Sequence, residues 1–541
     1  MRENQTNDLK SFRGVVLVIF VVGLLLRLWI AWRPLPTIDN LLFPDDTYIS
    51  MAIARNMALG RGMTFDGLAI TNGFQPLYVF LLVPLFKLIP NQLDLPIHIA
   101  LTGLALLNMA TAYFLMKILL RLIGQVAALF GLLIWVFSPI VIREGINGLE
   151  TGMAVFWMAL ATAVYVRAIG ASLTERKQAI LLGFVTGLAM FTRVDNVIFV
   201  GAVGLALLLR GGRLNRHNFI NALLMGMTVV VVMLPWFVIS YQCCGALLPE
   251  SGGAVRFQAL ASFHDIPGGA FTLLLYNFFV TLRILARSPM ELDHTIIWSF
   301  GFALLGLSVV TSYGRSLWRR LGHKVKQTEW IRRLWPIWLF IVLLLMAYNT
   351  YILAYWFFVR YFYPVTWVMT IVWASILTGA AVYISKRWQK PLWQISLFMG
   401  VILVFWFLPG LSKLLFSTPK QGGYYNIAIW ANETLPENTV LGSAQTGALT
   451  YWARPDLTVI NMDGVANPDA YAALESGEQM KYLREQGITY IVNWPINMDL
   501  LRDYGGEPLD TTIEPLGKTG VFTIEQEWEW YHVLPKEGDE S

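Results

Sequence analysis

Two adjacent carboxylates, Asp45 and Asp46, stand in the stretch FPDDTYISMAIARNMALGRG at residues 43–62. The residues after them have the spacing of a short amphipathic helix that ends at glycines. An aspartate at this place can cap a helix, but one cap requires only one side chain. A pair of carboxylates also suits a general base that takes a proton from a hydroxyl, a divalent cation site, or both. The capping and the chemical interpretations both stay open.

Two further polar stretches interrupt apolar sequence. REGINGLETG (143–152) carries Glu150 where an apolar run begins, and FTRVDN (191–196) carries Arg193 and Asp195 between two apolar runs. Glu150 could complement a helix dipole, and the second pair could form the polar tip of a hairpin. Alternatively, an acidic residue at membrane depth is often functional, and an arginine oriented by a carboxylate can bind a phosphate.

Two more arginines have neighbours that suit anion binding. Arg256 lies in the stretch GALLPESGGAVRFQ (245–258), after a turn-rich segment at 249–253 whose backbone N–H groups could cradle a phosphate. Arg360 lies among aromatic residues in FFVRYFYP (357–364). Ordinary glycine turns and an arginine snorkelling from an aromatic belt are the alternatives.

The composition indicates what positions these residues. The chain has 541 residues, of which 56% are hydrophobic and only 14% are charged, where soluble domains carry roughly 25%. This predicts a polytopic α-helical membrane protein. The net charge of +5 requires no nucleic-acid partner, because Lys/Arg-rich cytoplasmic loops account for it.

The basic loops predict the topology. All of these loops can lie in the cytoplasm only if the short apolar segments 75–90 and 271–288 do not cross the membrane. The prediction is therefore eleven membrane spans, within a total of about 11–13 transmembrane or re-entrant helices. The N-terminus is then cytoplasmic, and residues 33–96 form the first external loop. The predicted spans are 14–32, 97–120, 125–142, 151–170, 178–192, 195–210, 218–241, 295–313, 335–357, 361–384 and 392–413.

The sequence changes in character after residue 413. Strand-length apolar runs such as TVLGSA, LTVINMD, ITYIVNW and GVFTIEQEW alternate with helical patterns. We therefore predict a membrane domain at 1–413 and a small external α/β domain at 414–541. The candidate carboxylates and arginines all fall on the external face. Carboxylates that deprotonate an acceptor, together with arginines that bind a phosphate, suit a transfer reaction from a phosphate-activated donor.

The ordered motifs PDDTYISMAIARNMALGRG, NGLETG, FTRVDN, LLPESGGAVR and RYFYP resemble the GT-C superfamily of membrane glycosyltransferases, which use polyprenyl-phosphate sugars. The chain is most similar to the branch of cell-wall arabinofuranosyltransferases. The resemblance covers most of the chain, and its most specific motif is the Asp pair.

This resemblance implies an inverting transfer on the extracytoplasmic face of the cell (inner) membrane. Asp45 or Asp46 would be the base, and a glycan, lipid or protein would be the acceptor. A divalent cation (Ca, Mg or Mn) on Asp46 and Glu150 stays open. Arg193, Arg256 and Arg360 would bind the donor phosphate, with Glu150 and Asp195 in support. A transporter or flippase of a lipid-linked substrate, and a non-catalytic assembly subunit, are the alternatives.

Overall fold

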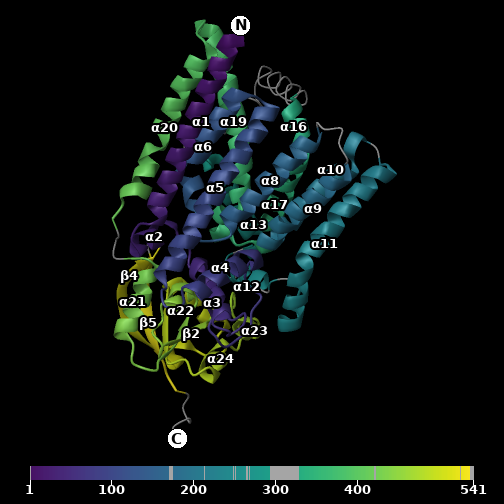
Figure 1. Ribbon diagram of the computed structural model, residues 1–541. Coiled ribbons are helices and arrows are strands. Elements are labelled where there is room, and N and C mark those ends of the chain that lie inside the picture. The colour runs from purple at the N-terminus through teal and green to yellow at the C-terminus, as the bar shows by residue number, and fades with distance from the viewer. Residues whose placement is uncertain are drawn as a thin grey trace.

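A computed structural model shows a bundle of helices with a small mixed sheet packed at one end (Figure 1). The N-terminus lies at the opposite end of the bundle from the sheet. The structure describes residues 2–169, 175–212, 214–247, 249, 251–263, 266, 268–292, 328–418, 422–523 and 526–535.

Eight of the described helical segments are long and apolar enough to cross a membrane. They are formed by α1 (Arg2–Ala31), α5 (Asp94–Leu122), α8 (Thr151–Ile169), α11 (Arg216–Cys244), α13 (Gly269–Arg287), α17 with η3 (Trp335–Ala347 and Tyr348–Ile352), α19 (Tyr363–Trp388) and α20 (Leu392–Phe416). Many of their large apolar side chains point outward, as three on α11 show: Val230, Val231 and Leu234. Such surfaces suit a lipid environment.

The spans differ from the predicted ones in several places. The predicted span 125–142 is broken into α6 (Gln125–Phe137) and α7 (Pro139–Gly145), which are bent by 63°. Segment 271–288 forms α13, which meets the requirements for a span although the charge pattern had excluded it. The predicted spans 178–192 and 195–210 are helical, as α9 (Glu175–Thr192) and α10 (Val197–Leu208), but neither is among the eight helical segments that meet the requirements for a span, and α10 is too short. The predicted span 295–313 lies outside the described residues.

Three short helices of the first loop lie between the bundle and the sheet domain (Figure 1). They are α2 (Leu35–Leu42), α3 (Asp46–Ala58) and α4 (Pro76–Leu88), and α4 is the segment predicted not to cross. Helix α12 (Ser251–Ala261) lies at the same level. The remaining short helices of the bundle are η1 (Val194–Asn196), η2 (Arg210–Gly212), α16 (Glu329–Arg333), η4 (Tyr355–Phe357) and α18 (Phe358–Tyr361).

The C-terminal domain is the predicted small α/β unit. Its five strands have the order β2-β1-β3-β5-β4, with β1 parallel to β2 and β3 and the other pairs antiparallel. The strands are β1 (Val440–Ser443), β2 (Thr458–Asn461), β3 (Tyr490–Asn493), β4 (Ile513–Thr523) and β5 (Gln526–Val533). The helices are α21 (Tyr424–Thr434), α22 (Gly447–Tyr451), α23 (Pro468–Ser476), α24 (Gln479–Glu485), α25 (Pro495–Tyr504) and α26 (Leu509–Thr512). The run GVFTIEQEW, predicted as one strand, instead contributes to both β4 and β5.

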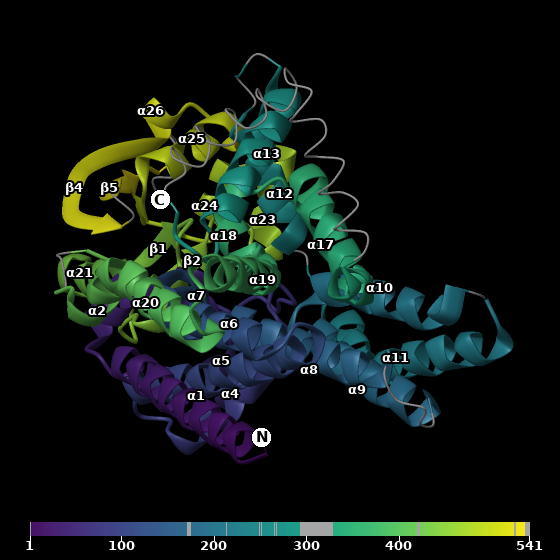
Figure 2. The same ribbon diagram turned by 90° about the horizontal axis from the view of Figure 1, so that it is seen from above.

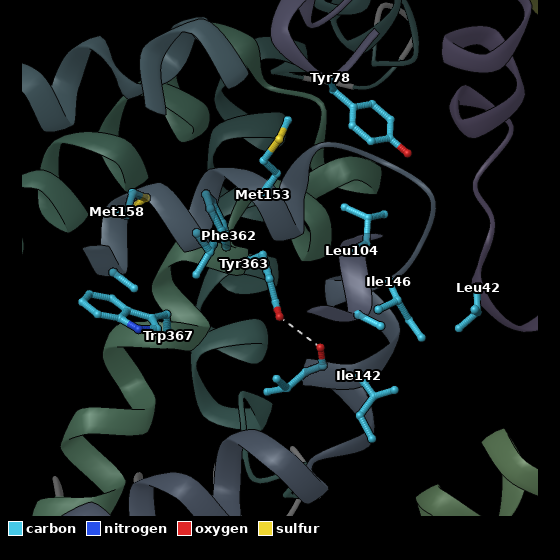
Figure 3. Packing of buried hydrophobic residues seen from close by; sticks show 14 of the residues in the cluster. Leu42, Tyr78, Leu104, Ile142, Ile146, Met153, Met158, Phe362, Tyr363 and Trp367 are labelled. Atoms are coloured by element: carbon cyan, nitrogen blue, oxygen red, sulfur yellow. Dashed lines mark hydrogen bonds between the residues drawn. The ribbon is translucent and has the colours of Figure 1, made fainter. Parts of the chain in front are cut away.

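Seen from above, α9, α10 and α11 lie on one side of the bundle and α1 and α20 on the other (Figure 2). The centre is packed by buried apolar side chains, among them Phe362 and Trp367 (Figure 3). The buried Tyr363 hydroxyl donates to the carbonyl of Val141 at 3.0 Å, so α19 is bonded to the broken helix α7 at this point.

Candidate functional site

Asp45 and Asp46 point to different parts of the molecule. Asp45 occupies the N-cap position of α3, yet its side chain makes no capping hydrogen bond. Its two oxygens accept instead from the backbone N–H groups of Gly447 (2.6 Å) and Ala448 (3.0 Å) in the C-terminal domain. Helix capping therefore does not explain Asp45.

Asp46 faces a cavity and is paired with an arginine. Its Oδ2 lies 2.6 Å from Nη1 of Arg360, and 32% of the Asp46 side chain is exposed against 11% for Arg360. Burial disfavours the charge on Arg360, but the attraction of Asp46 outweighs it and holds the pKa of Arg360 above its usual value. Asp46 is therefore the carboxylate of the pair that a substrate can reach.

Arg193 is the centre of a second charged group. Its guanidinium lies 2.6 Å from Glu150 and 2.9 Å from Asp195, and the Arg193 and Glu150 side chains are almost fully buried. The hydroxyl of Tyr348 accepts from Arg193 at 3.1 Å and donates to Asp195. Arg193 and Asp195 lie in the turn between α9 and α10, as the hairpin-tip interpretation expects, and residues of two other segments, Glu150 and Tyr348, meet Arg193 there.

One cavity of about 230 Å³ joins the two groups. The charged residues that line it are Asp46, Glu150, Arg193, Asp195 and Arg360. Tyr361 also lines it, and its ring lies beneath both guanidiniums, at 5.1 Å from Arg193 and 5.2 Å from Arg360. The cavity therefore combines three carboxylates with two guanidiniums, each of which is paired with at least one carboxylate.

Hydrogen bonds between loops bring these segments together. Thr47, in the first turn of α3, donates to the carbonyl of Asn147 at 2.9 Å. Tyr78 on α4 donates to the carbonyl of Gly148 at 2.7 Å. Gly148 has a φ of +79° and an added Cβ would lie 2.4 Å from Thr47, so only glycine fits this close approach. The first loop thus holds the segment that leads to Glu150.

Arg256 is placed differently from the other two candidate arginines. It is not among the cavity-lining residues, and its guanidinium lies over the ring of Tyr351 at 4.8 Å. The start of its helix does contribute, because Ser251 and Gly252 line the cavity.

Two residues of the cavity lining, Tyr348 and Tyr361, and Asp463 near the lining residue Val465 have no role in the sequence-based prediction. Tyr348 begins a π-helical turn, a local irregularity that often marks functional sites but that the sequence does not reveal. Asp463 belongs to the C-terminal domain, and burial raises its pKa to about 7, an effect to which the nearby Asp46 adds. Burial likewise raises the pKa of Asp45 to about 7, against the opposing effect of the two N–H donors.

The predicted cation site on Asp46 and Glu150 does not fit the arrangement of these residues. Each carboxylate is paired with a guanidinium at 2.6 Å, which leaves little negative charge for a cation. Within the described residues, no group of three or more His, Cys, Asp or Glu side chains could hold a metal ion. We therefore derive no step through a metal.

Comparison with known proteins supports the fold. The family described as "Domain of unknown function (DUF8728)" matches residues 417–534, and none of the curated proteins matches the chain. ArnT from Cupriavidus metallidurans, bound to undecaprenyl phosphate, is a structural neighbour with 13% identity and a TM-score of 0.51, covering 97% of this chain and 98% of its own.

The archaeal oligosaccharyltransferase AglB from Archaeoglobus fulgidus, in complex with an inhibitory peptide and a dolichol-phosphate, is another neighbour. It has 14% identity and a TM-score of 0.53, over 91% of this chain and 71% of its own. A further structure of the Archaeoglobus fulgidus oligosaccharyltransferase, in complex with Zn and sulfate, has 12% identity and a TM-score of 0.54, over 88% and 68%. The chain is thus a multi-pass membrane protein with the GT-C-like fold of these neighbours.

Proposed function

We propose that the chain is an inverting glycosyltransferase that moves a sugar from a polyprenyl-phosphate donor to an acceptor hydroxyl. The observation that carries the proposal is the single cavity in which the accessible carboxylate of Asp46 faces two buried guanidiniums. The neighbours that hold undecaprenyl phosphate and dolichol-phosphate support a lipid-phosphate donor. The cavity lies at the end of the bundle that carries the C-terminal domain, which we place on the extracytoplasmic face.

In the proposed reaction, the acceptor oxygen attacks the anomeric carbon from the face opposite the phosphate. The new carbon–oxygen bond forms as the bond to the phosphate oxygen breaks, and the electron pair leaves with the lipid phosphate. Asp46 takes the proton of the acceptor hydroxyl. The donor phosphodiester becomes a monoester and gains one negative charge, which the guanidiniums of the cavity can stabilise.

Arg360 and Arg193 would share the task of binding this phosphate. Arg360 can turn from Asp46 to the donor, which would leave the carboxylate free to act as the base. Arg193 would remain fixed, because Glu150 and Asp195 hold it from two sides. Arg256 has a weaker claim, since its guanidinium lies outside the cavity lining.

The test is sugar transfer by the purified chain in lipid nanodiscs, with a panel of polyprenyl-phosphate sugars and with glycan, lipid and peptide acceptors. The resemblance to the arabinofuranosyltransferase branch makes an arabinofuranose donor the first to try. Asp46→Asn should reduce turnover by about 10²–10⁴-fold, the usual contribution of a general base, while donor binding is retained. Asp94→Asn is the matched control, because Asp94 begins α5 and does not line the cavity.

Wild-type turnover in Asp46→Asn would show that Asp46 is not the base. Movement of labelled lipid-linked sugar across a vesicle membrane, without its consumption, would favour a transporter. A chelator arm decides metal dependence separately, since the residues of the cavity give no cation site of their own.

A further inference from the structure

The C-terminal domain contacts the first loop through two buried aspartates. Asp45 accepts the N–H groups of Gly447 and Ala448 at the start of α22. Asp39, on α2, accepts the N–H of Tyr425 at the start of α21 at 3.1 Å. Both aspartates are almost fully buried, with 4% of the surface of Asp45 and 2% of that of Asp39 exposed. Two helix starts of one domain are therefore bound by carboxylates of another.

The contact at Asp45 fits closely enough to restrict the sequence on both sides. A Cβ added to Gly447 would lie 2.2 Å from the backbone oxygen of Asp45 and 2.9 Å from its carboxyl carbon. No side chain can occupy that space without moving the first loop or the domain. A buried carboxylate that loses its donors is also costly, so the contact resists separation.

The contact of Asp45 affects the cavity because Asp46 is the next residue in the chain. Asp45 and Asp46 are consecutive, and the second begins α3. Successive side chains at a helix start point in directions roughly 100° apart, so fixing one fixes the direction of the other. With Asp45 bound to the domain, Asp46 is directed into the cavity, where it meets Arg360.

The same domain also forms part of the cavity. Val465 of the C-terminal domain lines it, and the carbonyl of the nearby Asp463 accepts from Gln258 on α12 at 2.7 Å. The domain therefore contributes to the cavity through its own loop, and through Asp45 it holds the start of the helix that carries Asp46.

We propose that Asp45 is a positioning residue rather than the base: by binding the start of α22, it makes the C-terminal domain a required part of the site that orients Asp46. The inference about Asp46 rests on the proposed function, but the contact itself does not.

Hydrogen exchange of the full chain in nanodiscs tests the contact without any substrate. Asp45→Asn replaces one accepting oxygen by an amide that cannot accept. We expect exchange in the peptide covering residues 445–452 to rise by about tenfold, the effect of losing one hydrogen bond to the buried carboxyl group. Asp46→Asn, the matched control, should leave that peptide as protected as in the wild type. Gly447→Ala disturbs the same contact from the other side and should reproduce the Asp45→Asn result.

Kinetics then separate positioning from catalysis. Asp45→Asn and Gly447→Ala should lower kcat by about 10–100-fold, as expected for a misplaced base, with the donor KM changed by less than about threefold. The acid limb of the pH–rate profile should persist in both variants, because the base is still present. Asp46→Asn should show no such limb.

Two results would overturn the inference. The first is hydrogen exchange at residues 445–452 that is unchanged in Asp45→Asn. The second is a pH–rate profile of Asp45→Asn that has lost its acid limb, together with sugar transfer that is retained in Asp46→Asn. If the wild type transfers no sugar from any donor, the proposed function fails while the exchange experiment still decides whether Asp45 holds the domain.

Discussion

Adjacent residues of the same type have different environments in this protein. Asp45 lies in the contact with the C-terminal domain, and Asp46 lies at the edge of a cavity beside a guanidinium. The sequence predicts that two carboxylates do more than cap a helix, and it cannot say which does what. That difference comes from Gly447, which is distant in sequence and donates to only one of them.

The three candidate arginines are separated by the same kind of evidence. Arg360 lines the cavity, whereas Arg256 stacks on Tyr351 outside the lining. We expect Arg360→Gln to weaken donor binding by about 10–100-fold, since hydrogen bonds to charged groups contribute roughly 1.5–3 kcal/mol. Arg256→Gln should change it by less than about threefold. Direct binding of a polyprenyl-phosphate sugar to each purified variant checks this. An equal loss of donor affinity in both variants would show that Arg256 also binds the donor.

At the scale of single elements, the break between α6 and α7 shows how the bundle accommodates an irregular segment. Pro139 has no backbone N–H, so the carbonyl of Trp135 has no helical partner there. Arg27 on α1 supplies one, donating to the carbonyls of Trp135 at 3.0 Å and Val136 at 3.1 Å. It also donates to Asn108 at 2.9 Å, which in turn donates to Tyr363. Arg27 is completely buried.

Removing this arginine should destabilise the bundle. Arg27→Met leaves two carbonyls at the break without donors, and each unsatisfied buried group costs about 1–3 kcal/mol. We expect a loss of about 2–5 kcal/mol in unfolding free energy, measured as a lower denaturation midpoint in detergent. Arg121→Met, at an exposed helix end, should change it by less than about 0.5 kcal/mol. Equal midpoints for the two variants would mean that water or a rearranged helix supplies the missing donors.

Only part of the arrangement at the break between α6 and α7 can be predicted from the sequence. Its hydropathy predicts an apolar segment at 125–142, and Pro139 is the one local sign of a break. The partner that makes the break tolerable is an arginine more than a hundred residues earlier, inside an otherwise apolar span. Local patterns predict elements well, whereas such long-range pairs follow from packing, which a single sequence does not display.

At the scale of the molecule, composition predicts a membrane bundle followed by a small α/β domain, and the structure has both. What composition does not predict is how the two parts meet. The contacts of Asp39 and Asp45 with the domain join residues 386 to 403 positions apart. No local pattern marks such pairs, so the site was predictable as a set of residue types and not as a geometry.

These interdomain contacts should depend on pH. Burial raises the pKa of Asp39, Asp45 and Asp463 to about 7, although their hydrogen-bond donors oppose the shift. When the domain separates and these carboxyls meet water, their pKa values return to near 4. The docked form therefore binds more protons, so its stability is greatest below about pH 4 and falls until pH passes about 7. We expect the domain to be held more firmly at pH 5 than at pH 8.

Hydrogen exchange in α21 and α22, corrected for the intrinsic pH dependence of amide exchange, measures this difference. Asp39→Asn should reduce the change between pH 5 and pH 8, because the amide side chain that it introduces cannot ionise. Asp456→Asn is the control: Asp456 is in the same domain, but hydrogen bonds from Arg454 lower its pKa, so it ionises fully below this range. Firmer docking at pH 8, or an unchanged pH dependence in Asp39→Asn, would show that the N–H donors outweigh burial and that the carboxylates are charged in the docked form.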